Sequence, residues 1–191
     1  MWAEHKQRGF TIVELLIVIV VIGILAAITI VSFNGVQQRA NSSKTVAALG
    51  AWMKVLSLYK VENSRWPGAG SCLGEGYLYG VSGSDPSGTA QCRQDSVGSG
   101  VLENTTFNNA VAPYIKGTKP TPAFVTARSS DSIWRRGLSY TYGGGDGTQV
   151  YIIATFAGTD ACPVVGSITA AGNVWDGNNW CVYQLGRTSD T

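Results

Sequence analysis

Few side chains in this sequence combine into a pattern that could carry out a reaction. The one histidine, His5, lies among nine N-terminal residues, MWAEHKQRG, and the carboxylates of the main body are scattered, mostly among turn residues. A serine or cysteine nucleophile needs a neighbouring base to activate it. The sequence therefore predicts no catalytic residue and no cofactor site.

One acidic residue, Glu14, has an unusual position, because it lies inside an apolar run. Arg8 and Gly9 lead directly into the residues FTIVELL, and the nineteen residues from Leu15 to Phe33 contain no charge. That length suits a bilayer-spanning helix of roughly 20 residues. A carboxylate within lipid costs about 2.5–3.5 kcal/mol, and such residues generally have a functional partner. We therefore expect Glu14 to make a specific interaction.

Two simpler interpretations of the N-terminus explain it less well. A secretory signal has an apolar core of about 7–15 residues followed by a small-residue cleavage site. Here the apolar run is longer, carries an acid at its start and continues into a helical pattern. A plain membrane anchor explains the length of the run but not Glu14.

The four cysteines all follow the apolar run and indicate disulfides rather than a metal site. None forms a CxxC pair, which disfavours zinc. An even number of cysteines outside the membrane fits two disulfides in an oxidising compartment. Three pairings exist in principle. We favour the sequence-local pairs Cys72–Cys92 and Cys162–Cys181, because each closes a loop of roughly 20 residues, worth about 3 kcal/mol.

Two other patterns, a group of arginines and two Gly-rich stretches, are weak evidence for a nucleic-acid surface or a calcium site. The net charge is only +2 and hydrophobic residues make up 45% of the chain, so no broad basic surface for nucleic acid is expected. The nearest approach is Arg128, Arg135 and Arg136, and DNA remains an unsupported partner. The Gly-rich stretches GGGDGT (143–148) and WDGNN (175–179) lack calcium-loop spacing and are expected to be hairpin turns.

The elements that must position these residues begin with one long helix. After Phe33 the composition becomes polar, and an apolar stripe then recurs at steps of three and four, which indicates an amphipathic helix; it comprises Val46, Leu49, Trp52, Met53, Leu56 and Tyr59. Pro67 cannot continue a helix. We predict one helix from about Phe10 to Asn63, with a first half suited to lipid and a second half suited to a globular domain.

The rest of the chain predicts a small antiparallel domain packed on that helix. Residues 68–100 resemble a stapled loop with little regular structure, and a short helix is expected at 105–115. Strands are expected at 138–142, 149–156 and 180–185, which are rich in aromatic and β-branched residues. The predicted class is α+β, a long N-terminal helix on a disulfide-stapled sheet of about three strands.

The segment RGFTIVELLIVIVVIGILAAI closely resembles the N-terminus of type IV prepilins and related pseudopilins. The resemblance rests on a short basic leader that ends in Gly9, on the aromatic Phe10 and on Glu14 four residues later. It covers residues 8–33 closely and the remainder more loosely. Many family members carry a proline or a helix-weakening glycine late in the apolar stretch, and residues 24–33 have neither.

The resemblance implies a processing and assembly route. Prepilin peptidase would cut between Gly9 and Phe10 on the cytoplasmic side and N-methylate Phe10. The subunit would stay in the cytoplasmic membrane by a single pass, with its head outside, until it leaves the lipid and packs its helix into an extracellular filament. In this family the acid that corresponds to Glu14 neutralises the N-terminal amine of a neighbouring subunit, so Glu14 is expected to be a docking group.

The expected organisation is a cleaved leader (1–9), a transmembrane and assembly segment (10–33), an amphipathic half-helix (34–66) and a globular head (67–191). The first functional hypothesis is a structural subunit of a type IV pilus that serves adhesion, motility or DNA uptake. The alternative is a pseudopilin of a type II secretion-like system, and a membrane-anchored surface enzyme is disfavoured. Expected partners are other pilin subunits, prepilin peptidase, the membrane assembly machinery and, before assembly, membrane lipid.

Overall fold

The computed structural model describes residues 10–77, 91–94, 100–128, 134–143, 148–175 and 177–187. The chain divides into two compact units, 1–37 and 38–191, and each is described by itself. The predicted leader (1–9), residues 144–147 of a predicted hairpin turn, and Asp176 lie outside the described residues.

Helix α1 (Ile12–Asn63) contributes to both units. It ends where the sequence predicts: Ser64 has a positive φ of 54°, a left-handed conformation that commonly terminates helices. The Asn63 side chain donates to the Tyr59 carbonyl (2.9 Å), which satisfies one acceptor of the last turn. Trp66 and Pro67, which follow the helix, are both buried in the head.

The apolar stripe of α1 is the centre of the core of the second unit. Leu49, Trp52 and Leu56 are completely buried. The Trp52 ring lies 6.2 Å from that of Phe107, and its indole N–H donates to the Pro120 carbonyl (2.7 Å). Steps of three and four along the helix therefore identify the buried face correctly.

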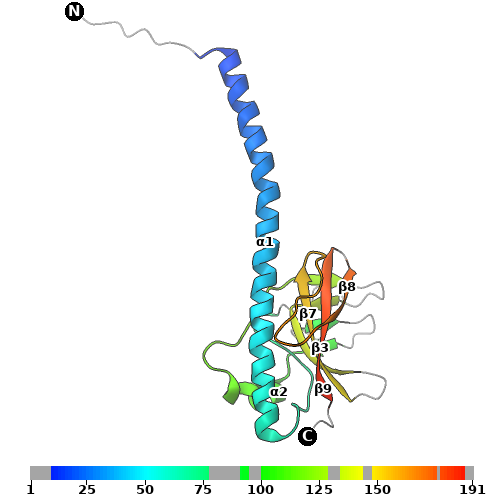
Figure 1. The fold of residues 1–191 in the computed structure, drawn as a ribbon. Helices are drawn as coiled ribbons and strands as arrows, with labels where there is room; N and C mark the ends of the chain where they lie inside the picture. Colours follow the sequence, from blue (N-terminus) through cyan, green and yellow to red (C-terminus); the bar gives the residue numbers. More distant parts are fainter. Residues whose placement is uncertain are drawn as a thin grey trace, which may run out of the picture. The chain divides into compact units, whose positions relative to one another are not determined.

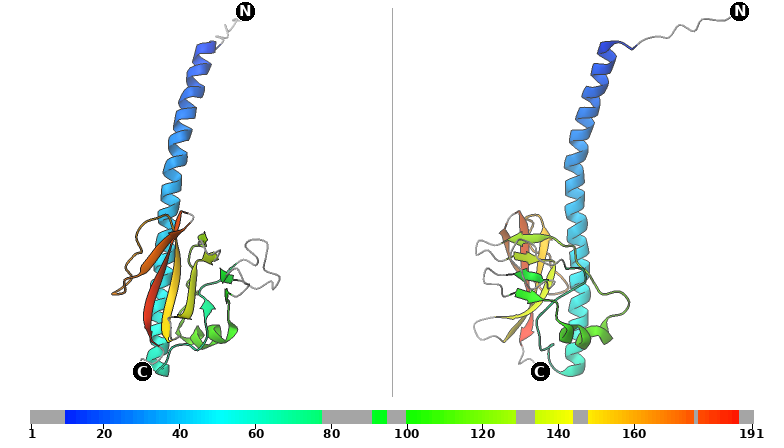
Figure 2. Two further views of the ribbon diagram at one scale, coloured as in Figure 1. Left: turned by 90° about the vertical axis from the view of Figure 1, so that its right-hand side faces the viewer. Right: turned by 180° about the vertical axis from the view of Figure 1, so that it is seen from behind.

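This stripe packs on an antiparallel sheet of five strands in the order β1-β6-β7-β9-β8 (Figures 1 and 2). The strands are β1 (Ser71–Cys72), β6 (Leu138–Gly143), β7 (Gln149–Ala157), β8 (Ala171–Trp175) and β9 (Asn178–Arg187). The predicted strands correspond to β6, β7 and β9. The α+β class is confirmed, but a sheet of about three strands was too few.

A second sheet has the order β3-β2-β5-β4. Its strands are β2 (Gln91–Gln94), β3 (Gly100–Leu102), β4 (Thr126–Arg128) and β5 (Trp134–Arg136). The prediction that residues 68–100 have little regular structure is therefore wrong for the described ends of that segment, which form β1, β2 and the start of β3. These strands are short and pair with distant residues, so the local sequence carries little signal for them.

The second sheet explains why the central strand β7 is apolar along its length. Val150, Ile152 and Ala154 are fully buried in the core with α1, and the alternate residues Ile153 and Thr155 are also buried. A strand covered on both faces has a continuous apolar run instead of an alternating one. The remaining elements, helix α2 (Thr105–Val111) and the 3-10 helix η1 (Ala112–Tyr114), confirm the predicted short helix at 105–115.

Candidate assembly segment and stapled head

The first part of α1 exposes apolar side chains on every face. All residues from Phe10 to Ile30 are exposed, and the most apolar stretch has a mean hydropathy of 3.2. In water this surface would be strongly unfavourable. Within the described part of the chain, α1 is the one helix long and apolar enough to cross a membrane.

Glu14 lies in the first turn of this helix and forms a reciprocal cap with Thr11. The Thr11 backbone N–H and hydroxyl both donate to Glu14 Oε2, at 2.9 and 2.8 Å, while the Glu14 N–H donates to Thr11 Oγ1 at 3.2 Å. This is the capping box that a threonine and a glutamate three residues later can form. One carboxylate oxygen, Oε2, is thereby engaged within the chain.

Thr11 is a residue that the sequence analysis did not single out. The spacing T-x-x-E directly before an apolar run is the signal that could have identified it. Phe10 precedes this cap and is 84% exposed, whereas Gly9, the other residue of the expected cleavage site, lies outside the described residues. The structure thus places Phe10 and Glu14 at the same end of one apolar helix.

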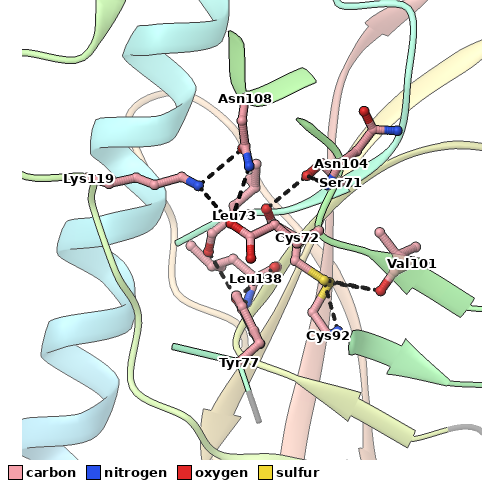
Figure 3. Close-up of a disulfide and its surroundings, with 11 residues drawn as sticks. Ser71, Cys72, Leu73, Tyr77, Cys92, Val101, Asn104, Asn108, Lys119 and Leu138 are labelled. Atoms are coloured by element: carbon pink, nitrogen blue, oxygen red, sulfur yellow. Dashed lines mark hydrogen bonds and ion pairs between the residues drawn. A yellow bond between two sulfur atoms is a disulfide. The ribbon is translucent and has the colours of Figure 1, made fainter. Parts of the chain in front are cut away.

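The four cysteines form the disulfides Cys72–Cys92 and Cys162–Cys181, the pairs favoured from the sequence. The first lies in a buried cluster with Tyr77. It ties β1 of the large sheet to β2 of the second sheet (Figure 3). Its role is to join two sheets that meet through short strands.

Tyr77 holds the segment that follows the first of these cysteines. Its hydroxyl accepts from the Leu138 N–H (3.0 Å) and lies 2.9 Å from the carbonyls of Leu73 and Leu138 (Figure 3). Burial raises the pKa of the Tyr77 hydroxyl far above its ordinary value, because an anion there would be poorly solvated. Nearby, Lys119 pairs with Glu103 (3.3 Å) and also donates to Asn108.

The second disulfide fixes the segment between β7 and β8. Cys162 lies in this segment and Cys181 lies in β9. Two side-chain bonds add to the staple: Asn179 donates to the Asp160 carbonyl (2.6 Å), and the Tyr183 hydroxyl donates to the Pro163 carbonyl (2.8 Å). A loop outside the regular sheet is therefore held by β9 at several points.

Of the three arginines, Arg135 and Arg136 are partly or fully withdrawn from solvent. Arg128 and Arg135 lie on the paired strands β4 and β5. The guanidinium of Arg135 lies 4.0 Å from the centre of the Trp180 ring, and Arg135 is only 7% exposed. Partial burial also lowers the pKa of Arg136. Arg135 therefore contributes to packing between strands instead of facing solvent.

The two Gly-rich stretches lie where antiparallel strands follow each other. Gly177, with φ of 72°, connects β8 to β9, as expected for a hairpin turn. β6 pairs antiparallel with β7, while residues 144–147 between them are outside the described part. Among the residues that the structure describes, no three His, Cys, Asp or Glu side chains gather as metal ligands.

Comparison with known proteins finds one family model and several relatives that are similar to part of the chain. The family described as "Prokaryotic N-terminal methylation motif" matches residues 5–30. Two relatives carry the name type II secretion system core protein G. The protein from Dickeya chrysanthemi is 38% identical over 71 residues, or 37% of this chain and 46% of the relative. That from Escherichia coli (strain K12) is 39% identical over 67 residues, or 35% and 46%.

A third relative is the fimbrial protein of Neisseria meningitidis serogroup B, 32% identical over 68 residues, or 36% of this chain and 40% of the relative. The methylation motif and these relatives agree with the exposed apolar helix, its capped Glu14 and the stapled α+β head. Residues 5–30 thus carry the N-terminal methylation motif, and this part of the chain resembles type IV pilins and pseudopilins.

The similarity to these proteins covers only part of each chain. The chain spans about half the length of the curated relatives it matches. No solved structure matches this chain. The two sheets and both disulfides of the head are therefore known here from this chain's own structure.

Proposed function

We propose that this chain is a pseudopilin, a filament-forming subunit of a type II secretion-like system. The support comes from the names of its relatives. Seven of them are called type II secretion system core protein G, at 35–41% identity, while the fimbrial protein is less similar. This order reverses the sequence-based hypotheses, in which a type IV pilus subunit came first. The pilus role is retained as the second candidate.

In this proposal prepilin peptidase cuts between Gly9 and Phe10 and N-methylates Phe10. The cut precedes the apolar helix, so the mature subunit keeps its membrane anchor. The head, with two disulfides, lies on the oxidising side of the membrane. The subunit then enters a filament of like subunits with the help of the assembly machinery.

The structural observation that supports a filament-forming subunit, in either system, is the carboxylate of Glu14 at the head of a fully exposed apolar helix. The Thr11 cap engages Oε2, while Oε1 has no hydrogen bond with a described residue. Cleavage would create a positive amine on Phe10, and a charge packed among apolar helices is expensive unless it is paired. Glu14 Oε1 of a neighbouring subunit would supply the opposite charge.

The head has a structural role in this proposal, and the protein is not an enzyme. Two of its buried tyrosines hold the fold together: the Tyr77 hydroxyl bonds Leu138 of β6, and the Tyr140 hydroxyl donates to the Pro67 carbonyl (3.1 Å). These are contacts that fix a fold.

Deletion of the gene in its native host tests the choice between the two filament systems. We expect secreted enzymes to accumulate inside the deletion strain while surface pili remain. Complementation with the wild-type gene should restore secretion, and the mature protein in the membrane fraction should begin at Phe10 by intact-mass measurement. Loss of surface pili with normal secretion would favour the pilus role, and a start at Met1 or beyond residue 27 would contradict both.

A further inference from the structure

The head has two different surface features on the flanks of α1. The first, which we call the lysine groove, is a hollow of about 210 Å³; it is lined by Lys54, Leu58, Tyr114, Ile115, Lys116 and Pro120. The second, the Asp160 loop, comprises residues 158–164 after β7. Residues 114–120 and the segment 158–170 run on opposite sides of α1 (Figures 1 and 2).

The lysine groove combines an apolar floor with positive charge. Leu58 is 45% exposed there, although it lies beside Ile115 and Pro120. Lys54 and Lys116 are both exposed and form no ion pair with a described residue. One carboxylate, Glu62, interacts with Tyr114 at the end of the groove, so two ammonium groups outnumber it. An apolar segment with a carboxylate is the ligand that this groove fits.

The Asp160 loop has that chemistry and is held in place. Asp160 is exposed and has no ion pair with a described residue, and Val164 is 62% exposed. The loop is fixed by the Cys162–Cys181 disulfide, by the bond from Asn179 to the Asp160 carbonyl and by the bond from Tyr183 to Pro163. A loop that is ordered before binding loses less entropy when it binds.

We propose that the Asp160 loop of one subunit docks into the lysine groove of a neighbouring subunit. The proposal rests on the proposed function, because it needs α1 helices that pack parallel to each other. The two surfaces differ, so the contact is heterologous, and such contacts build open filaments unless the rotation closes a ring. Asp160 would lie between Lys54 and Lys116, with Val164 against Leu58.

The positions of the two features along α1 set the offset between the two subunits. The Asp160 loop borders the α1 residues Ser42, Ser43, Val46 and Ala47, and the lysine groove borders Lys54 and Leu58. At about 1.5 Å per residue, Ser43 and Lys54 are separated by roughly 16 Å along the axis. The subunit that donates the loop is therefore displaced by about that distance toward the C-terminal end of α1.

This offset differs from that of the docking contact at the membrane end. Phe10 and Glu14 are separated by only four residues, or roughly 6 Å along a helix. The head contact therefore joins a subunit to a more distant neighbour than the contact between the Phe10 amine and Glu14. Two contacts with different axial offsets would hold both ends of the subunit in the filament.

Charge reversal in the full-length protein tests the head contact. We expect the double variant Lys54→Glu/Lys116→Glu to lower the sheared, sedimentable polymer by roughly five-fold, since repulsion replaces attraction. Asp160→Lys should have a similar effect, and combining the three substitutions should restore polymer. Lys44→Glu and Glu75→Lys, exposed positions outside both features, are the matched controls. Membrane levels and non-reducing peptide maps show that each variant folds.

Carbodiimide treatment of wild-type polymer gives an independent measurement. It should link the Asp160 carboxylate to Lys54 or Lys116 in a dimer-sized band, a link that the opposite flanks of α1 prevent within one chain. Reversal variants that polymerise as well as wild type, or Lys54 links to another protein only, would overturn the head contact and leave the proposed function intact. A wild-type chain that forms no polymer in its native host would instead refute the proposed function, and the head contact with it.

Discussion

Thr11 and Glu14 satisfy each other at the beginning of a helix whose surroundings are apolar. The first turn of any helix has backbone N–H groups without a partner in the helix, and lipid offers no water to satisfy them. The capping box engages two of these donors, the N–H groups of Thr11 and Glu14. The same carboxylate therefore has a local role before it has any role between subunits.

This local role can be separated from docking by changing Thr11. We expect Thr11→Val to weaken the first turn by about 1 kcal/mol, because the variant lacks the hydroxyl that caps the helix. Amide hydrogen exchange of residues 12–15 in lipid bilayers should be faster than in wild type. Thr11→Ser keeps the hydroxyl and should exchange like wild type. Equal exchange in all three proteins would contradict the capping role.

We expect buried tyrosines to make the stability of the head sensitive to high pH. Burial raises the pKa of Tyr77, Tyr140 and Tyr183 well above the ordinary value of 10.0. Their contribution to stability is complete below the pKa of the unfolded chain, about 10, and is lost as pH rises through that value toward the folded pKa. We expect the head to unfold above about pH 10.

Ultraviolet absorbance and near-ultraviolet circular dichroism, followed together in a pH titration, test this expectation. Tyrosinate absorbance from the buried group should appear with the loss of the dichroism signal. If all the tyrosinate absorbance instead appears near pH 10 while the dichroism signal of the folded head persists, that result would contradict the burial of these three hydroxyls.

Among the elements, the second half of α1 contributes a row of buried side chains to the core of the head. Trp52 is completely buried and bonds Pro120, whereas Leu58 lies on the exposed side of the same helix. We expect Trp52→Ala to cost about 3–5 kcal/mol and Leu58→Ala about 0.5 kcal/mol or less. Thermal melts of the detergent-solubilised protein measure the difference. Similar melting temperatures for the two variants would contradict the assignment of Trp52 to the buried face of α1 and of Leu58 to its exposed face.

The Cys162–Cys181 disulfide, which links β9 to the loop after β7, should stabilise mainly that loop. Replacement of Cys162 and Cys181 by alanine removes a cross-link worth about 3 kcal/mol. Limited proteolysis should then cut within residues 158–170 first, while the Cys72–Cys92 pair persists in a non-reducing peptide map. First cleavage elsewhere in the head would contradict a local role for this disulfide.

The sequence predicts those elements whose signal is contained in their own residues. The stripe from Val46 to Tyr59, the stop at Pro67 and the aromatic, β-branched strands β6, β7 and β9 are of this kind. Strands β1 and β2 are only two and four residues long and exist because β6 and β5 pair with them. Strand β8 (AGNVW) lacks a periodic pattern, and its pairing with β9 defines it.

The residues of the candidate sites divide in the same way, into those with a signal in the local sequence and those that only the fold brings together. Glu14 could be identified from the sequence because a charge interrupts an apolar run, and the cysteine pairs because each closes a short loop. The lysine groove could not be predicted, since Lys54 and Lys116 are distant in sequence and the fold brings them together beside α1.

At the scale of the whole molecule, the two units have opposite surface chemistry. The first unit exposes apolar side chains from Phe10 to Ile30, and the second has a conventional core stapled by disulfides. A subunit of this design is stable in lipid or in a bundle of similar helices. The exchange between those two environments is the step in which Glu14 should act.

The most direct test of this account compares Glu14→Ala with Glu75→Ala, a matched change of an exposed carboxylate in the head. Three quantities are measured in the native host: the level in the membrane, the N-terminal mass, and the amount in the sheared filament fraction. Both variants should be made, cleaved before Phe10 and inserted, since removal of a charge favours insertion.

The two variants should differ only in the filament fraction. Glu75→Ala should be incorporated like wild type, whereas Glu14→Ala should be absent, because the amine of Phe10 would enter an apolar helix bundle without a counter-charge, at a cost of several kcal/mol. Cleaved Glu14→Ala subunits present in sheared filaments at the wild-type level would contradict the docking role of Glu14.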